Sequence, residues 1–146
     1  MARSGEPTGT NDLWRLSAVE LDRGFRARAF LPSEVLESVL ARAATVNAAV
    51  NALVFVDAEG ARAAARPADA RTRRGERLGA LDGVPFHLKD NLFWEGRPAT
   101  WGSRLYADHV APADDHPVRA LRRAGAIPFA KTNTPEFAMA QVTDNA

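Results

Sequence analysis

The sequence predicts an α/β fold in which helices cover a mixed, at least partly parallel sheet. Short apolar runs at residues 52–56, 83–89 and 127–131 alternate along the chain with helix-forming segments. Apolar runs of this length are typical of strands, and strands that alternate with helices favour parallel pairing. In such sheets ligands bind in a crevice beyond the carboxyl ends of the strands, which is where Lys89 falls.

Two helices are predicted before the first strand. Residues 1–12 are rich in glycine, proline, threonine and charge, which predicts a flexible tail. Residues 17–20, Ser-Ala-Val-Glu, match a capping box and predict a helix over 18–29. Pro32 and Glu34 suit the first turn of a second helix. Its apolar residues fall on one face at three- and four-residue spacing: Val35, Leu36, Val39, Leu40, Ala43 and Val46.

The next segments predict a strand and a third helix. Residues 52–56, ALVFV, have no polar position, which is typical of a strand buried on both faces. Asp57 can cap a helix over residues 58–73. Four arginines follow at its end and could contact phosphates, but no aromatic residue interleaves them and acidic residues flank them. They are therefore interpreted as a solvated helix end and loop: Arg71, Arg73, Arg74 and Arg77.

Residues 92–114 have no clear period and are predicted to form a long loop. Its aromatic residues Trp94, Trp101 and Tyr106 are expected to pack it onto the body, although binding of a base or an aromatic substrate is the alternative. A short helix is expected between residues 116 and 124.

The last predicted elements are a strand and a helical turn. Pro128 lacks an N–H group, so the strand over residues 127–131 is expected at an edge or with a bulge. Residues 134–136, Thr-Pro-Glu, are expected to open a final helical turn.

Composition limits the function classes. The 146 residues, 46% hydrophobic and 25% charged, fit one globular domain, and a net charge of +1 gives no field for nucleic acid or an anionic membrane. The chain has no cysteine for a disulfide or a thiolate metal site. No signal-peptide core and no membrane-spanning run is present, so a cytoplasmic protein is expected.

The main candidate for chemistry is Lys89, at the polar end of the run GVPFHLKDN. Only two of the 19 basic residues are lysines, Lys89 and Lys131. Arginine keeps its proton near neutral pH, whereas a desolvated lysine can release it, which makes Lys89 a candidate for proton transfer. The alternative is an ordinary lysine left by a small sample. In a regular strand His87 shares the face of Lys89, and Asp90 points to the other face and ties the strand end to the loop.

Three segments, LDGVPFHLKDN, RPATWGSRLY and RRAGAIPFAKTNTPEFAMAQVTDN, together resemble the N-terminal part of the amidase signature family, serine hydrolases of amide bonds. The resemblance implies that residues 13–146 are the N-terminal part of an amidase domain, truncated at the C-terminus, so the predicted fold is incomplete as given. It also implies that Lys89 is the lysine of a Lys–cis-Ser–Ser triad. Both serines would lie in a glycine- and serine-rich segment beyond Ala146.

By this resemblance, the intact protein is expected to hydrolyse a small-molecule carboxylic amide without a cofactor or a metal, and this chain alone to be inactive. One alternative is the A subunit of a glutamine-dependent tRNA amidotransferase, with protein partners and a tRNA client. Another is a non-catalytic fragment or interaction domain. Direct contact with nucleic acid or membrane is not expected, and a homo-oligomer stays open. Candidates for substrate binding are Met139, Ala140 and Gln141.

Two other groupings stay as alternatives. Ser103 can pair with Lys89 as a catalytic dyad, although the resemblance makes its segment structural. A metal site would need His87, His109 and His116 with Asp108, Asp114 and Asp115, but no pair has the i, i+4 spacing of a zinc motif. The chain alone is also expected to expose a sheet edge and apolar surface and to be poorly soluble.

Overall fold

The computed structural model describes residues 10–143 and confirms the alternation of strands and helices. The elements are η1 Thr10–Arg15, α1 Ala18–Ala27, α2 Pro32–Val50, β1 Leu53–Val56, α3 Ala58–Arg74, β2 Pro85–Lys89, η2 Arg104–Tyr106, α4 His116–Arg123, β3 Ile127–Thr132 and η3 Glu136–Ala138. The predicted tail falls mainly on residues 1–9, outside the described part, and its last three residues lie in η1.

The strands form a mixed sheet in the order β1-β3-β2, with β2 parallel and β1 antiparallel to β3. The strand with Pro128 is expected at an edge or with a bulge, and β3 is the central strand. The predicted bulge is confirmed. Phe86 pairs with Pro128 and His87 with Ala130, so Phe129 is the extra residue opposite β2. The bulge accommodates a proline, which cannot donate to the ladder, inside a central strand.

Strand β1 is not buried on both faces, contrary to the prediction. Leu53 and Phe55 are half-buried, whereas Val54 and Val56 are 47% and 41% exposed. β1 forms an edge of the sheet, and the described helices leave these two side chains open to solvent. A short apolar run predicts that a segment is a strand, but it does not show whether other elements cover one face of that strand or both.

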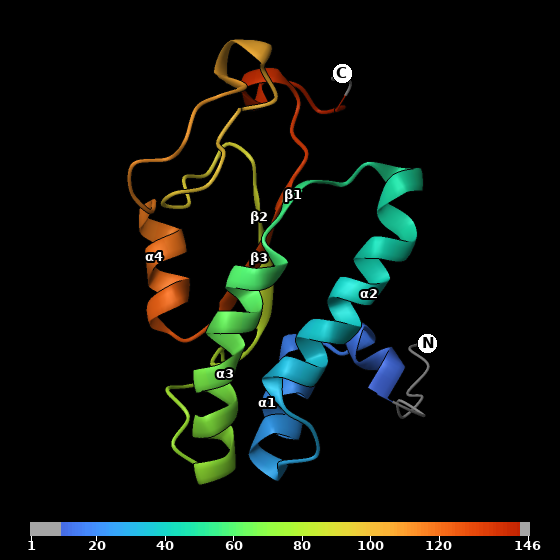
Figure 1. Cartoon of the computed structure of the whole chain (residues 1–146), viewed down its shortest axis with the longest axis vertical. Coiled ribbons are helices and arrows are strands. Elements are labelled where there is room, and N and C mark those ends of the chain that lie inside the picture. Colours follow the sequence, from blue (N-terminus) through green and yellow to red (C-terminus); the bar gives the residue numbers. More distant parts are fainter. Residues whose placement is uncertain (1–9, 144–146) are drawn as a thin grey trace.

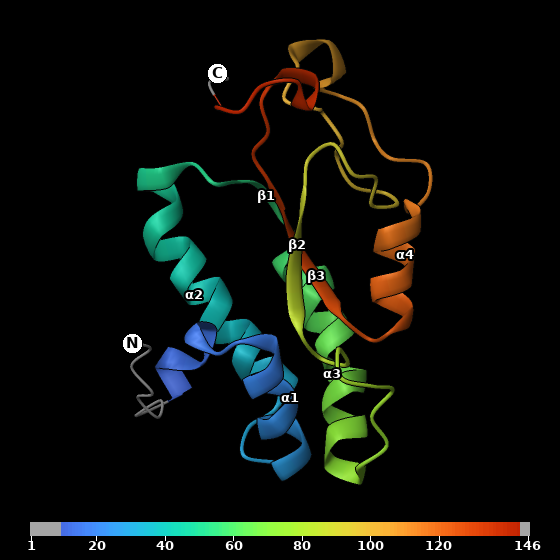
Figure 2. The ribbon, with the colours of Figure 1, turned by 180° about the vertical axis from the view of Figure 1, so that it is seen from behind.

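The helices pack on the sheet in separate groups, as Figure 1 and the opposite view in Figure 2 show. Helices α2 and α3 and strand β3 share one core cluster: Leu36, Leu40, Ala61, Ala65, Ala68, Ile127, Phe129 and Ala130. Elements η1, α1 and α2 enclose Phe25 beside Val84, which leads into β2. Helix α4 contributes Val118 to a third cluster, which contains Leu88 of β2. This packing fixes the strands whose ends carry the candidate site.

Local signals at the helix ends are confirmed. The Ser17 N–H donates to Glu20 Oε2 at 2.7 Å and the Glu20 N–H to Ser17 Oγ at 3.3 Å, which is the predicted capping box. Asp57 Oδ1 accepts from the Gly60 N–H at 3.0 Å at the start of α3. The final helical turn is also present, as η3.

Two of the four arginines near the end of α3 are not solvated as predicted. Arg71 pairs with Asp82, which is 0% exposed. The Arg77 side chain is 6% exposed, lies over the Phe25 ring and pairs with Asp22. Their partners come from other elements, which a local sequence window does not reveal. Arg73 and Arg74 are exposed, as expected.

Candidate functional site

The loop between β2 and α4 and the segment after β3 meet at one end of the sheet. Both lie at the top of Figure 1 and of the reverse view in Figure 2. This end holds the carboxyl ends of the parallel strands β2 and β3. It therefore matches the place where the sequence predicts a ligand crevice.

Lys89 is the last residue of β2 and pairs with Thr132 of β3. Its carbonyl oxygen accepts a hydrogen bond from the Leu92 N–H at 2.9 Å, which closes a turn directly after the strand. Burial alternates as predicted: His87 and Lys89 are exposed, and Leu88 and Asp90 are buried on the other face. The described residues thus place the Lys89 side chain at the crevice end without desolvating it.

Asp90 ties the end of β2 to the loop, as predicted. Its side chain is buried, and Oδ2 accepts hydrogen bonds from both the N–H, at 3.0 Å, and the hydroxyl of Thr100. Its N–H donates to the Thr132 carbonyl at 3.0 Å. Its other carboxylate oxygen, Oδ1, lies 3.3 Å from Nζ of Lys131.

Lys131 of β3 is 0% exposed and is a charged residue for which no role was predicted from the sequence. Its Nζ donates to the carbonyl oxygens of Leu92 at 2.7 Å, Pro98 at 2.9 Å and Asp90 at 3.3 Å. Burial lowers the pKa of this ammonium, while the carboxylates of Asp90 and Asp115 act in the opposite direction. The rarity of lysine in the chain was the one available signal for this residue.

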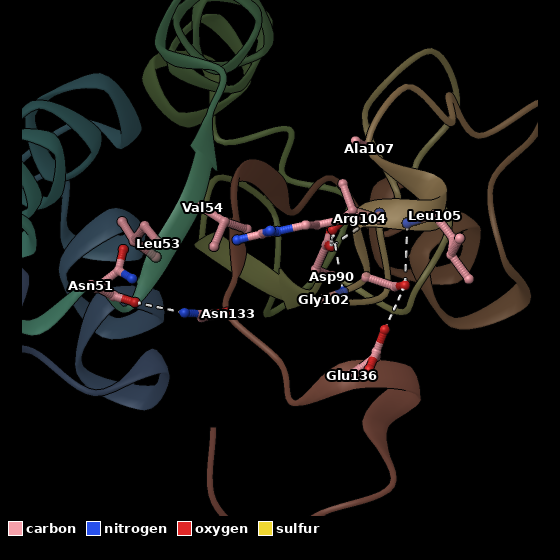
Figure 3. Close-up of a pocket in the computed structure, with 12 residues that line it drawn as sticks. Asn51, Leu53, Val54, Asp90, Gly102, Arg104, Leu105, Ala107, Asn133 and Glu136 are labelled. Carbon is pink, nitrogen blue, oxygen red and sulfur yellow. Dashed lines mark hydrogen bonds between the residues drawn. The ribbon is translucent and has the colours of Figure 1, made fainter. Parts of the chain in front are cut away.

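A pocket of about 730 Å³ opens beside Asp90 (Figure 3). This volume is within the range of small-molecule sites. The pocket lies between the start of β1, the loop after β2 and the start of η3, and Lys89 itself is not on its wall. The wall residues are Asn51, Leu53, Val54, Asp90, Thr100, Gly102, Ser103, Arg104, Leu105, Ala107, Asn133 and Glu136.

Ser103 fastens the loop to η3. Its buried hydroxyl donates to Glu136 Oε1 at 2.7 Å and accepts from the Leu105 N–H at 3.3 Å. The Phe137 N–H also donates to the Trp101 carbonyl at 2.8 Å. These contacts favour the structural interpretation of Ser103 over a dyad with Lys89.

The loop aromatics differ in environment. Trp94 is 4% exposed and packs with Leu88 and Val118, which confirms its predicted packing role. Trp101 and Tyr106 are 36% and 43% exposed and stack near one another at 6.0 Å between ring centroids. They pack mainly within the loop and against η3.

The remaining candidates do not join the pocket. Met139, Ala140 and Gln141 follow η3 and are exposed, Met139 to 85%, and none of them lines the pocket. Within residues 10–143, no three His, Asp or Glu side chains gather in a way that could hold a metal ion. In that same part of the chain, no helix is long and apolar enough to cross a membrane.

Comparisons with known proteins identify the family of the chain. A family model described as amidase matches residues 34–146. The chain is 45% identical, over 136 residues, to the A subunit of a glutamyl-tRNA(Gln) amidotransferase from Acidothermus cellulolyticus. This match covers 93% of the chain and 27% of the relative. The chain is 41% identical, over 133 residues, to an indoleacetamide hydrolase of Bradyrhizobium diazoefficiens. This match covers 91% of the chain and 25% of the relative.

The fold is similar to that of solved amidase structures. A crystal structure of an amidase superposes with a TM-score of 0.79 and 33% identity, covering 89% of this chain and 30% of the other. The chain thus spans about a quarter of the length of the curated relatives it matches.

Proposed function

Because this chain belongs to the amidase signature family, we propose that it is the N-terminal part of an enzyme that hydrolyses the C–N bond of a small carboxylic amide, with Lys89 as the triad lysine. The observation that carries the proposal is the position of Lys89 at the carboxyl end of β2, at the end of the sheet where the loop after β2 and the segment after β3 meet. The resemblance of GVPFHLKDN to the family motif supports this role for Lys89, and its place at the strand end is consistent with it.

In the proposed mechanism Lys89 acts as base and then as acid. Its neutral amine takes a proton through the cis-serine from the serine that attacks the carbonyl carbon, and returns it to the leaving amine as the C–N bond breaks. Water then attacks the resulting acyl-serine ester, gives its proton to the same relay, and releases the carboxylic acid as the serine regains its proton. A lysine accepts a proton only when burial or a cationic neighbour favours its neutral form. Since Lys89 is exposed among the described residues, the proposal requires that the sequence with the two serines also covers Lys89.

The first test is to read the coding sequence past Ala146 and to express the complete protein. A downstream glycine- and serine-rich segment is expected. Lys89→Ala should lower amide hydrolysis by about 10²–10⁴-fold, the usual contribution of a general acid–base group. Ammonia release measures the rate, and circular dichroism checks that the variant is folded.

Ser103→Ala tests the alternative dyad. Because Ser103 lies on the pocket wall and its hydroxyl binds Glu136, a structural role predicts a far smaller loss of turnover than in Lys89→Ala. Retained activity in Lys89→Ala would remove Lys89 from the mechanism. Loss in Ser103→Ala with an intact fold would instead support the dyad.

A second candidate is the A subunit of a glutamine-dependent tRNA amidotransferase, favoured by the relative of that name at 45% identity. It predicts stable co-purification with partner subunits and glutamine hydrolysis, whereas a free-standing amidase would act alone. A stop codon directly after Ala146 would instead support a non-catalytic fragment.

A further inference from the structure

We propose that Lys131 is a positioning residue for amide hydrolysis: its buried ammonium holds the turn after Lys89 and neutralises the carboxylate of Asp90. The inference rests on the proposed role of Lys89 and assigns a task to the second lysine of the chain.

The ammonium of Lys131 is matched to one segment of backbone. A protonated lysine has three N–H donors and no acceptor. Three carbonyl oxygens surround Nζ, those of Leu92, Pro98 and Asp90 at 2.7, 2.9 and 3.3 Å. All three belong to the nine-residue stretch 90–98, which starts directly after Lys89. A full set of acceptors offsets the cost of burying the charge.

This arrangement connects Lys131 to the backbone of Lys89 through one residue. The Leu92 carbonyl accepts from Lys131 Nζ at 2.7 Å, and the Leu92 N–H donates to the Lys89 carbonyl at 2.9 Å. Both polar backbone groups of Leu92 are therefore fixed. Without the ammonium of Lys131 the turn at Leu92 would lose a hydrogen bond, and the backbone of Lys89 at the end of β2 would no longer be held in one orientation.

The second effect of Lys131 is electrostatic. Asp90 is 1% exposed and adjacent in sequence to Lys89. An uncompensated carboxylate at Asp90, one residue along the chain from Lys89, would favour the protonated form of Lys89, which cannot act as a base. Lys131 Nζ lies 3.3 Å from Asp90 Oδ1 and opposes that field.

The other charged group that acts on Lys131 is Asp115, at the start of α4. Its Oδ2 accepts from the Phe93 N–H at 2.8 Å. On the strand face of Lys89 itself, the titratable neighbour is His87. Asp90 is thus the carboxylate next to the proposed base in sequence, and Lys131 lies against it.

The test is the pH–rate profile of the complete enzyme with three variants. In Lys131→Met, the uncompensated Asp90 should move the midpoint of the acidic limb of kcat/KM upward by about one pH unit. Adding Asp90→Asn to Lys131→Met should return the midpoint towards the wild-type value. Asp90→Asn alone leaves the charge of Lys131 uncompensated and should move the midpoint of the acidic limb downward.

If Lys131→Met lowers kcat/KM but leaves the midpoint of its acidic limb unchanged, Lys131 has only a structural role and the proposal is overturned. If Lys131→Met does not fold, Asp90→Asn alone decides, because an unchanged midpoint there also overturns it. Lys89→Ala separates the two proposals. Activity in Lys89→Ala refutes the assignment of Lys89, whereas an inactive Lys89→Ala with unmoved midpoints in the other variants refutes only the role of Lys131.

Discussion

Removing Arg71 is expected to destabilise the protein by about 3 kcal/mol at pH 7. Asp82 immediately precedes the segment that leads into β2 and Lys89, and its side chain is fully buried. It accepts from Arg71 Nε at 2.9 Å and from the Leu78 N–H at 3.0 Å, and Arg71 Nη2 contributes a further bond. In Arg71→Ala the buried carboxylate of Asp82 keeps one hydrogen bond from the described residues, that from the Leu78 N–H.

The magnitude follows from the burial of the two partners. Breaking a buried pair by removing one partner costs about 3–5 kcal/mol, because an uncompensated charge stays inside. The Arg71 side chain is 21% exposed, so solvent already screens part of the interaction and the lower end of that range applies. With a urea m-value of about 2 kcal/mol/M, the unfolding midpoint should fall by about 1.5 M.

The loss should depend on pH in a defined direction. Burial raises the pKa of Asp82, but the hydrogen bonds from Arg71 and Leu78 outweigh it, and the net pKa is lowered. A carboxyl group with a lowered folded pKa stabilises the protein above its unfolded pKa of about 3.9, and this contribution disappears as the pH falls through the folded value. The difference between wild type and Arg71→Ala should therefore shrink below about pH 4.

Urea unfolding followed by tryptophan fluorescence at several pH values measures this difference. Arg73→Ala is the matched control, since Arg73 is exposed on the same helix and its loss should cost less than about 0.5 kcal/mol. Equal destabilisation by both variants, or a difference that does not change on acidification, would refute the reasoning.

Two further predictions concern the start of β3 and the two lysines. Gly125→Ala places a Cβ 2.3 Å from Asp82 Oδ1 at a φ of +85°, so the melting temperature of the protein should drop by about 4 °C or more. Gly79→Ala is the control, because its Cβ would have no atom within 4 Å and should leave the melting temperature nearly unchanged. Similar melting temperatures for the two variants would contradict this prediction. In the 146-residue chain, an amine-acylating reagent followed by mass spectrometry should modify exposed Lys89 at least about 100-fold faster than buried Lys131, which reacts only after local opening. In the complete enzyme Lys89 should become protected as well, and equal labelling of the two lysines would contradict their placement.

Features with a local cause could be predicted from the sequence. The capping box at Ser17 needs only Glu20, three residues on, and Pro32 opens α2 without help from another element. Pro128 predicts an edge strand or a bulge, but the choice between them depends on the order of strands, which is set by pairing between distant segments. The partners of Arg71 and Arg77 lie 11 and 55 residues away, so their burial could not be read from neighbouring residues.

The candidate site was predictable only in part for a similar reason. Lys89 stands in a motif and at a strand end, both of which are visible in the sequence. The contacts of Lys131 are to backbone carbonyls 33 to 41 residues away. A carbonyl oxygen is present at every residue and carries no sequence signature, so this arrangement appears only when β3 and the loop are placed together.

The contrast between the two lysines bears on which of them can serve as the base. Deprotonating Lys131 would remove a donor from a set of three carbonyl acceptors and leave Asp90 without its opposing charge, although burial outweighs these contacts and lowers the pKa of Lys131. Lys89 is exposed on the opposite face of the strand end, where a covering segment can adjust its environment without breaking this network. The hydrogen bonds of Lys131 therefore suit it to hold the turn, and Lys89 is the lysine that can exchange a proton without disturbing those bonds.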